Sequence, residues 1–400
     1  MSSEPDQLKV IGASWCPDCR RAKAFLNEQR VPYEWVDLEE QPDAIETVER
    51  LNGGSRTIPT LVFPDGSHLA EPANDEIAEK LGLTRSATSR VYDVIMVGGG
   101  PTGLTAAIYA ARENQRVLII EKSAPGGQAG VTERLDNYPG FPDGVAGHEL
   151  ADRMRRQAER YGVEILQAVA VTGLTSSDAW VSVTTSTGVV YEARAVLLAT
   201  GSIYRRTGAE GESDLIGAGV HFCATCDGPF YRGSEEVVVI GGGNSGLEEG
   251  LFLTEFADHV TVVEFSDQLA GSRLLQDKVR QHPKMGVLTN TQVRRFTGEK
   301  GRLISLELED RESKSVTTHR ANGAFVFVGL DPNTAFLGDQ VELDERGFVV
   351  SDEQFQTTLP GVFVAGDVRR GSTKQLASAV GEGAAASIQI RYFLDKRAAL

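Results

Sequence analysis

The stretch VYDVIMVGGGPTGLTAAIYAARENQRVLIIEK, residues 91–122, contains an apolar strand, a glycine turn, an apolar helix and a second apolar strand. The turn carries the pattern G-x-G-x-x-G at Gly98, Gly100 and Gly103. These glycines permit a tight turn, a close approach of backbone N–H groups to a pyrophosphate, and close packing of the helix on the strand. Glu121 ends the second strand, where a carboxylate is expected to bind a ribose. The stretch therefore predicts a βαβ unit that binds a dinucleotide.

A second copy of this pattern, EEVVVIGGGNSGLEEGLFLTEFADHVTVVEF, spans residues 235–265. One such turn alone is weak evidence, but two turns that each follow an apolar strand and precede an acidic residue are strong evidence. The residues expected to bind the second nucleotide are Gly241, Gly243, Asn244, Ser245, Gly246 and Glu264. Two dinucleotide sites in one chain indicate a flavin beside a nicotinamide, held by two Rossmann-like α/β domains.

The first 80 residues alternate strand and helix in the order β-α-β-α-β-β-α, which is typical of a thioredoxin-like fold. The strands are predicted in KVIGA, YEWVDL, TLVFP and HLA, and the helices at residues 17–29, 43–51 and 74–80. The polar stretch LTRSATSR, residues 83–90, has no apolar periodicity and is predicted to be a flexible linker.

The chain has only four cysteines, and they form two C-x-x-C pairs, Cys16 with Cys19 and Cys223 with Cys226. The start of the sequence lacks the features of a signal peptide, so we expect a cytoplasmic protein, in which such pairs are more often catalytic, redox-sensing or metal-binding than structural. The gap between the pairs is far longer than zinc-ribbon spacing, and we therefore expect no metal site.

The overall charge argues against several classes of partner. With 40 Lys and Arg against 56 Asp and Glu, the formal net charge is −16, and no basic run is present. Such a chain is poorly suited to a nucleic acid or an anionic membrane, so we expect neither as a partner.

Residues 92–396 resemble the low-molecular-weight thioredoxin reductases. The resemblance is carried by GGGPTGLTAAIYAAR, APGGQAG, DNYPGF, LLATGS, CATCDGPFY, IGGGNSGLEE and VFVAGDV. It implies an FAD domain in two parts, residues 92–204 and 330–396, with a nicotinamide-nucleotide domain, residues 205–329, inserted between them. It also implies a homodimer, and hinges near residues 205–208 and 329–332. The larger glutathione-reductase type, which has its cysteine pair in the first FAD segment, does not match.

The same resemblance assigns the site residues. It places FAD contacts at Gly98, Gly100, Gly103, Glu121, Gly127, Gln128, Asn137, Gly366, Asp367 and Gln375. It makes Cys223–Cys226 the redox disulfide, with Cys226 facing the flavin and Cys223 attacking the outgoing disulfide. Asp227 would be the acid that protonates a leaving thiolate, although a D-G-P sequence is also ordinary turn chemistry.

Residues 1–83, followed by a linker at 84–91, resemble glutaredoxins and most closely the mycoredoxin-like group, through SWCPDC, TIPT, FPDGS and ANDEI. The resemblance implies that Pro59 is cis and lines the disulfide site. Cys16 would sit at the start of a helix opened by Pro17, where free N–H groups favour a thiolate, and Cys19 would resolve mixed disulfides. The segment LAEPANDEI departs from the glutathione-binding pattern, so glutathione recognition is not expected from it.

The second nucleotide site departs from the thioredoxin reductase pattern H-R-R-x-x-x-R. Glu264 takes the place of the histidine, Phe265 and Ser266 replace two arginines, and Ala270 replaces the third. A carboxylate suits a free 2′-hydroxyl and repels a 2′-phosphate, so we predict NADH rather than NADPH. The E-F pair is similar to the flavoprotein subunit of alkyl hydroperoxide reductase.

The sequence therefore predicts a relay from NADH through FAD and Cys223–Cys226 to Cys16–Cys19, and from there to another disulfide. A peroxiredoxin, a thioredoxin, a glutaredoxin-type protein, a ribonucleotide reductase, and a mycothiol or bacillithiol mixed disulfide remain open as substrates. The alternatives are an NADPH-dependent thioredoxin reductase, a peroxiredoxin reductase component, and a redox-sensing flavoprotein without turnover.

Overall fold

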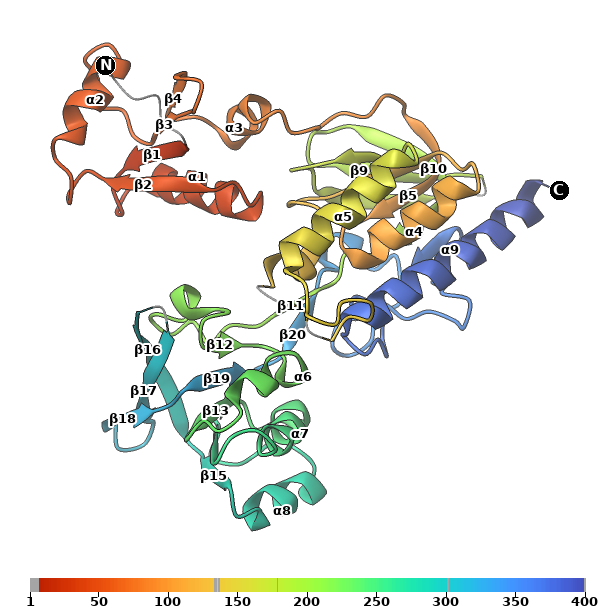
Figure 1. Ribbon diagram of the computed structural model, residues 1–400. Helices are drawn as coiled ribbons and strands as arrows, with labels where there is room; N and C mark the ends of the chain where they lie inside the picture. The colour runs from red at the N-terminus through yellow and green to blue at the C-terminus, as the bar shows by residue number, and fades with distance from the viewer. Residues whose placement is uncertain (1–6, 133–134, 136, 178, 301, 399–400) are drawn as a thin grey trace.

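The computed structural model describes residues 7–132, 135, 137–177, 179–300 and 302–398. They form three units: an amino-terminal unit (residues 7–82), a split unit (91–198 and 335–398) and an inserted unit (205–329). Figure 1 shows the amino-terminal unit and the inserted unit as separate bodies, each joined to the split unit. None of the helices in these ranges is both long enough and apolar enough to span a bilayer.

The amino-terminal unit is a four-stranded sheet with helices packed on it, as the sequence predicts. Its elements are β1 (Leu8–Gly12), α1 (Pro17–Glu28), β2 (Tyr33–Asp37), α2 (Ala44–Leu51), β3 (Thr60–Val62), β4 (His68–Ala70) and α3 (Asn74–Lys80). The sheet order is β2-β1-β3-β4, with β1 and β2 parallel and the remaining pairs antiparallel. Val10, Leu26, Leu61 and Ile77 are fully buried in its core.

The split unit joins two segments that lie far apart in the chain. The first segment supplies β5 (Val91–Val97), α4 (Pro101–Arg112), β6 (Val117–Ile120), α5 (Gly147–Arg160), β7 (Glu164–Leu166), β8 (Val171–Ser176), β9 (Val181–Thr185) and β10 (Val190–Leu198). The second supplies β21 (Val362–Val364) and α9 (Leu376–Ala398). Strand β21 pairs with β10 in parallel, so both segments share one sheet of order β7-β6-β5-β10-β9-β8. Helices α4, α5 and α9 lie close together in this unit (Figure 1).

The inserted unit repeats the same architecture on a smaller scale. It contains β12 (Val220–His221), α6 (Ala224–Asp227), β13 (Val237–Ile240), α7 (Asn244–Leu253), β14 (Val260–Val263), α8 (Arg273–Gln281), β15 (Met285–Leu288), β16 (Thr291–Glu299), β17 (Arg302–Asp310), β18 (Val316–Arg320) and β19 (Gly323–Val326). Its parallel sheet has the order β12-β19-β13-β14-β15, and β16-β17-β18 form a separate antiparallel sheet.

The chain crosses between the split and inserted units twice, at one place. Strands β11 (Ser202–Tyr204) and β20 (Leu330–Pro332) pair antiparallel as a two-stranded ribbon. Arg205 and Asp331 form an ion pair at the end of this ribbon, with 2.6 Å between Nη2 and Oδ1. The two segments named as hinges in the sequence analysis therefore lie side by side.

The connector at residues 83–90 differs from the flexible linker that its composition predicts. Its backbone forms hydrogen bonds to the split unit, with polar groups of residues that are distant in the sequence. The bonds are Gln167 N–H to Thr84 O (2.7 Å), Ala87 N–H to Tyr191 Oη (3.2 Å) and Thr88 N–H to Glu164 Oε2 (2.7 Å). The amino-terminal unit is therefore held on the split unit rather than loosely tethered to it.

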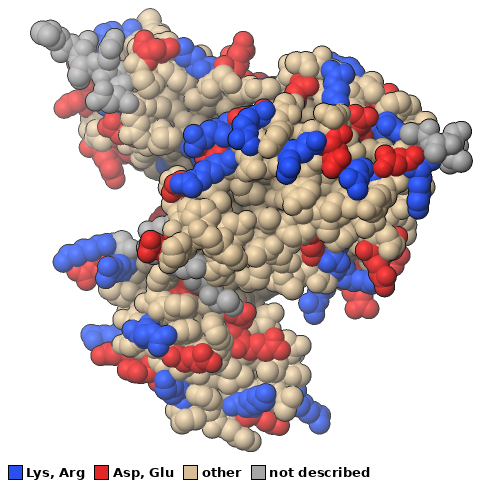
Figure 2. All heavy atoms as spheres, turned by 45° about the vertical axis from the view of Figure 1, so that its right-hand side comes forward, with Lys and Arg blue, Asp and Glu red and all other residues tan. Residues whose placement is uncertain are grey.

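Charged side chains of both signs are interspersed over the face of the molecule in Figure 2. The same view shows an open recess between the amino-terminal unit and the inserted unit.

Candidate active site

Cys16 occupies the position expected of a nucleophilic cysteine. It is the N-cap residue of α1, with Pro17 in the first turn, and Cys19 N–H donates to Cys16 Sγ at 3.2 Å. Free amide groups at a helix N-terminus favour negative charge on such a sulfur. Cys16 Sγ also lies 4.0 Å from Ile58 O, and the Ile58–Pro59 peptide bond is cis. The structure thus brings Pro59 beside Cys16.

Cys19 differs from Cys16 in its burial and in its hydrogen bonding. Its side chain is 1% exposed, and both cysteines of this pair are free thiols. Burial, together with the hydrogen bond to Cys16, raises the pKa of Cys19 to about 12. A Cβ atom on Gly12 would overlap Cys19 Sγ, so this glycine makes room for the sulfur. Cys16 is 5% exposed, whereas Trp15, next to it, is 64% exposed.

We expect iodoacetamide to modify Cys16 of the reduced protein at pH 8 and to leave Cys19 unmodified until the pH is well above 9. The pKa of Cys19 is raised above its ordinary value of 9.0, so the folded state retains this proton when the unfolded chain loses it. Its contribution to stability is complete below pH 9 and is lost as the pH rises towards 12. Mass spectrometry of labelled peptides across this pH range checks the prediction, with urea-unfolded protein as the control. Equal labelling of both cysteines at pH 8 would contradict it.

The second cysteine pair lies at the start of α6 in the inserted unit, whereas the first pair lies in the amino-terminal unit. Cys223 immediately precedes α6 and is disulfide-bonded. The side chain of Cys226 lies outside the described residues, and its expected orientation towards the flavin stays a prediction. Asp227 N–H bonds to Cys223 O at 3.1 Å, which closes the turn of this short helix. Asp227 is therefore also a turn residue.

Asp227 is linked to two residues that the sequence analysis did not identify. His221 Nδ1 lies 3.3 Å from Asp227 Oδ2, and His221 Nε2 lies 2.6 Å from Tyr231 Oη. His221 is buried and stacks on Phe325, with 5.1 Å between ring centroids. Burial, and then the charge of Asp227, raise the pKa of Tyr231. The Tyr231–His221–Asp227 chain can therefore hold the carboxyl group in a fixed orientation.

Tyr204, on β11, connects this loop to the split unit. Its ring stacks on Phe222, the residue before Cys223, with 5.2 Å between centroids. Burial raises the pKa of Tyr204 to about 12, and the negative charges of Asp367, Glu249 and Asp227 add to the shift. Because Asp367 is a predicted FAD contact, the redox helix and the FAD site converge on this tyrosine.

The glycines of the first dinucleotide pattern form a cradle that side chains would fill. Gly98 has φ +105°, Gly100 is the N-cap of α4, and a Cβ atom on Gly103 would overlap Gly98 O. A Cβ atom on Gly127 would come within 3.0 Å of Gly100 Cα. The bare backbone at the start of α4 therefore fits a pyrophosphate.

The other predicted FAD residues have defined contacts in the same unit. Glu121 accepts hydrogen bonds from Gly99 N–H (2.6 Å) and Ser123 N–H (2.7 Å). Asn137 Nδ2 donates to Gln375 Oε1 at 3.2 Å, which joins the two segments of the split unit at the site. The remaining residues are Gln128 in the 3₁₀ turn Gly127–Val131, Gly366 with φ +77°, and Asp367, whose pKa is raised by burial.

The second dinucleotide site repeats the arrangement of the first. Gly241 has φ +112°, Gly243 is the N-cap of α7, and a Cβ atom on Gly246 would overlap Gly241 O. Asn244 Oδ1 accepts from Ser272 N–H at 2.7 Å, and Ser245 lies exposed in the first turn of α7.

Glu264 reproduces the hydrogen bonds of Glu121 in this second site. Glu264 Oε2 accepts from Gly242 N–H at 2.6 Å, and Oε1 accepts from Ser266 N–H at 2.8 Å. A cation that the sequence analysis missed lies nearby, since the Arg311 guanidinium is 3.6 Å from the Phe265 ring centroid and bonds to Phe265 O at 2.9 Å. Arg311 lies on the turn after β17, 46 residues along the chain from Phe265, so no local motif indicates their contact.

Comparison with known proteins places these sites in a family. Residues 92–383 match the pyridine nucleotide–disulphide oxidoreductase model, and residues 8–69 match the glutaredoxin model. The thioredoxin reductase of Listeria innocua is 38% identical over 312 residues, which are 78% of this chain and 96% of that protein. The chain belongs to the thioredoxin reductase family. This reductase is a flavoprotein disulfide oxidoreductase with a glutaredoxin domain at its amino terminus.

Two further relatives inform its architecture. The bifunctional thioredoxin reductase/thioredoxin of Mycobacterium leprae is 39% identical over 323 residues, which are 80% of this chain and 69% of that protein. The thioredoxin reductase structure from Streptococcus pyogenes is 37% identical, covers 77% of this chain and 100% of its own, and gives a TM-score of 0.74. The Lactococcus lactis enzyme in its FR conformation, at 34% identity with 76% and 99% covered, gives only 0.53. The family resemblance stated in the sequence analysis is thus confirmed, as are the α/β fold and its amino-terminal glutaredoxin-like domain.

Proposed function

We propose that the reductase uses NADH to reduce the Cys223–Cys226 disulfide and then passes the electrons to its own Cys16–Cys19 pair. The glutaredoxin domain would deliver them to a disulfide of another protein. The chain carries both cysteine pairs, and Cys16 lies at the N-cap of α1, a position typical of cysteines that take part in disulfide exchange. This proposal accounts for the placement of all four cysteines.

The observation that carries the choice of NADH is the geometry of Glu264. Its two carboxylate oxygens are fixed by Gly242 N–H and Ser266 N–H at the end of β14, where a nucleotide ribose binds in this fold. A fixed carboxylate can accept hydrogen bonds from a free 2′-hydroxyl, whereas it repels a 2′-phosphate. The residues 265–268 that follow it, Phe-Ser-Asp-Gln, include no cation.

The exchange between the cysteine pairs balances in electrons and atoms. The glycine cradle and Glu121 of the first site would hold FAD, whose chemistry would be two-electron transfer from the nucleotide to the disulfide of the inserted unit. Cys223, as a thiolate, would attack the Cys16–Cys19 disulfide and form a mixed disulfide with one of these sulfurs. Cys226 would then attack Cys223, which releases the Cys16–Cys19 dithiol and restores the Cys223–Cys226 disulfide. The Cys16–Cys19 pair gains the two electrons and two protons that the other pair loses.

The Tyr231–His221–Asp227 chain supports a proton-transfer role for Asp227. His221 can donate from Nδ1 to the carboxylate while its Nε2 is paired with the tyrosine hydroxyl, which keeps one ring orientation. We therefore assign Asp227 to protonation of the leaving thiolate and His221 to positioning of that carboxyl group.

Transfer between the two cysteine pairs requires movement. Helix α1, whose N-cap is Cys16, and helix α6 lie in separate units in Figure 1, whereas disulfide exchange needs direct contact between sulfurs. The ribbon of β11 and β20 is the natural pivot for the inserted unit, since both chain crossings lie there. The difference between TM-scores of 0.74 and 0.53 at similar identity is consistent with units that change their relative orientation within this family.

We propose a protein disulfide, such as that of a peroxiredoxin or a thioredoxin, as the final substrate. The exposed ring of Trp15 beside Cys16 offers an apolar contact to a polypeptide. The M. leprae relative combines a reductase with a thioredoxin in one chain, which supports a built-in carrier here. We further propose that the protein acts in the cytoplasm as a homodimer.

Anaerobic mixing of the purified protein with NADH and, separately, with NADPH tests the proposal. We expect flavin bleaching to be at least tenfold faster with NADH, and excess NADH to expose four thiols per chain, one for each of the four cysteines. Faster bleaching with NADPH would reject the NADH assignment. If either nucleotide bleached the flavin but no external disulfide was then reduced, the result would favour the redox-sensing alternative.

A further inference from the structure

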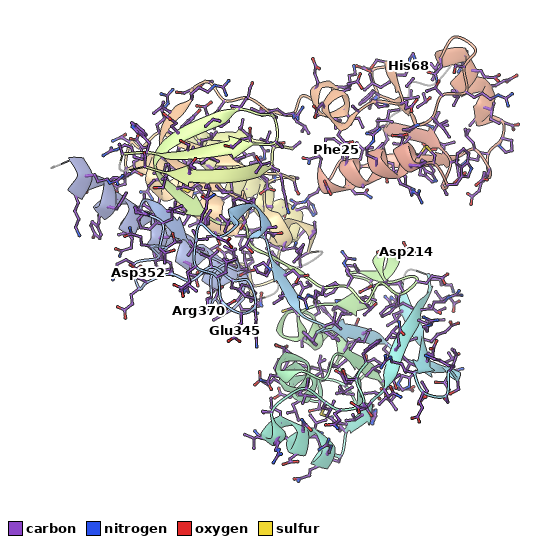
Figure 3. All side chains as sticks on the ribbon, turned by 180° about the vertical axis from the view of Figure 1, so that it is seen from behind. Phe25, His68, Asp214, Glu345, Asp352 and Arg370 are labelled. Atoms are coloured by element: carbon purple, nitrogen blue, oxygen red, sulfur yellow. The ribbon has the colours of Figure 1, made fainter. Side chains whose placement is uncertain are left out.

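The end of helix α1 forms a corner that projects from the glutaredoxin domain towards the FAD domain. Helix α1 ends at Glu28, Gln29 is its C-cap, and Arg30 has a left-handed backbone with φ +54°. This turn sends the Arg30 side chain out of its own domain. Phe25, in the last turns of α1, is labelled in Figure 3 at the side of the domain that faces the FAD domain.

Arg30 bonds to two carbonyl groups of the loop that contacts FAD. Arg30 Nη1 donates to Pro125 O at 2.8 Å, and Nη2 donates to Gly127 O at 2.6 Å. Two further bonds flank this pair, from Gln29 Nε2 to Lys122 O (3.2 Å) and from Ala124 N–H to Glu28 O (3.2 Å). The corner of residues 28–30 therefore follows the loop of residues 122–127 along most of its length.

The loop is shaped to accept the guanidinium. A Cβ atom on Gly130 would overlap Arg30 Nη1, Cζ and Nη2, so only a glycine leaves room there. Behind the loop, a Cβ atom on Gly126 would overlap the side chain of Ala151 on α5. The loop is thus packed between the arginine and the body of the FAD domain.

The same loop is part of the FAD cradle. Gly126 N–H donates to Gly99 O at 2.7 Å, and Gly127 lies against Gly100 at the start of α4. Burial lowers the pKa of Arg30. The negative charge of Glu121, the expected ribose ligand, lies close enough to Arg30 to act in the opposite direction. The guanidinium therefore lies between the glutaredoxin domain and two parts of the predicted FAD site, Glu121 and the loop of residues 125–127.

The contact between residues 28–30 and the loop of residues 122–127 does not involve the redox cysteines of the glutaredoxin domain. Helix α1 has 12 residues, which corresponds to about 18 Å, and Cys16 is at its other end. The docked corner and the cysteine pair are thus at opposite ends of one helix, as Figure 1 shows for the ends of α1. Arg30 Nε and Gln29 Oε1 are buried without a hydrogen-bond partner within the described ranges, so this contact is not fully satisfied. Such an interface can be released at a lower cost than a fully paired one.

We propose that Arg30 couples FAD binding to the docking of the glutaredoxin domain, by fixing the loop of residues 125–127 in the conformation that FAD requires. Arg30 is a positioning residue in this scheme. If docking of the glutaredoxin domain raises the affinity for FAD, then by thermodynamic linkage bound FAD strengthens the docking by the same factor. Loss of FAD would then release the carrier domain from the reductase.

The test compares FAD release from the holoenzyme of three variants. Arg30→Met removes the charge and the donors but retains the aliphatic stem, Gly130→Ala obstructs the guanidinium from the other side, and Arg50→Met changes an exposed arginine on α2 as the matched control. Flavin fluorescence after dilution gives the affinity for FAD. We expect about tenfold weaker binding for Arg30→Met and for Gly130→Ala, within the usual range of coupling between sites. The control should equal the wild type.

Two further readouts separate a coupled contact from a local defect. The double variant Arg30→Met/Gly130→Ala should bind FAD no more weakly than the weaker single variant, because both remove one contact. Hydrogen exchange at Ala124 N–H, which bonds to Glu28 O, should be faster in FAD-free than in FAD-bound protein. Wild-type FAD affinity in Arg30→Met, additive losses in the double variant, or exchange that does not depend on FAD would each overturn the proposal.

Discussion

Replacing Cys16 by serine is expected to abolish turnover with a protein disulfide while flavin reduction by NADH proceeds at the wild-type rate. The loss should be on the order of 10³-fold or more, as expected when the nucleophile of a covalent step is removed. Serine is slightly smaller than cysteine and suits the N-cap position of α1, so the domain should fold normally. Steady-state assays with a reduced-disulfide readout and stopped-flow flavin bleaching separate the two steps.

The thiol count gives a second measure of the same change. With Cys16 and Cys19 both replaced by serine, excess NADH should expose two thiols, the four of the wild type minus the two removed. The variant Cys223→Ser should instead block reduction of the Cys16–Cys19 disulfide while leaving that pair intact. If Cys16→Ser kept full turnover with the protein substrate, Cys223 would be passing electrons directly to it, and the glutaredoxin domain would lie outside the circuit.

Local periodicity was sufficient to predict most of the secondary structure around the sites. The two glycine turns, their strands and the closing carboxylates Glu121 and Glu264 are contiguous in sequence, so each βαβ unit can be inferred from about 30 residues. The amino-terminal helices and strands were predicted within one or two residues for the same reason. The position of Cys16 at the N-cap followed from Pro17 alone.

Contacts between distant segments could not be predicted in this way. Residues 83–90 have the composition of a flexible linker, and only the folded structure brings Glu164 and Tyr191 to their backbone. The stacking of His221 on Phe325 of β19 likewise joins segments that are distant in the sequence. Arg30 is one of many charged residues in the sequence, and its role depends on how two domains pack.

Exchanging residues 264–266 for the thioredoxin reductase pattern is expected to reverse the nucleotide preference. The variant Glu264→His/Phe265→Arg/Ser266→Arg should change the ratio of kcat/KM for NADH to that for NADPH by about 100-fold in favour of NADPH, which corresponds to about 2.7 kcal/mol. It removes the carboxylate that repels a 2′-phosphate and adds two cations that can bind it. Steady-state kinetics with both nucleotides and one disulfide acceptor measure this ratio.

Two single variants show which part of the site causes the preference. Glu264→Gln retains the size of the side chain and a carbonyl acceptor for Gly242 N–H or Ser266 N–H, so it tests the charge without a large change of structure. It should lower kcat/KM for NADH and raise kcat/KM for NADPH, each by less than in the triple variant.

Arg311→Met removes the cation that stacks on Phe265. If Arg311 held a 2′-phosphate, this variant would lose activity with NADPH and retain its activity with NADH. The nucleotide preference of the wild type would then depend on Arg311 in the turn after β17 rather than on the carboxylate of Glu264. An unchanged ratio in Arg311→Met together with a shifted ratio in Glu264→Gln assigns the preference to Glu264.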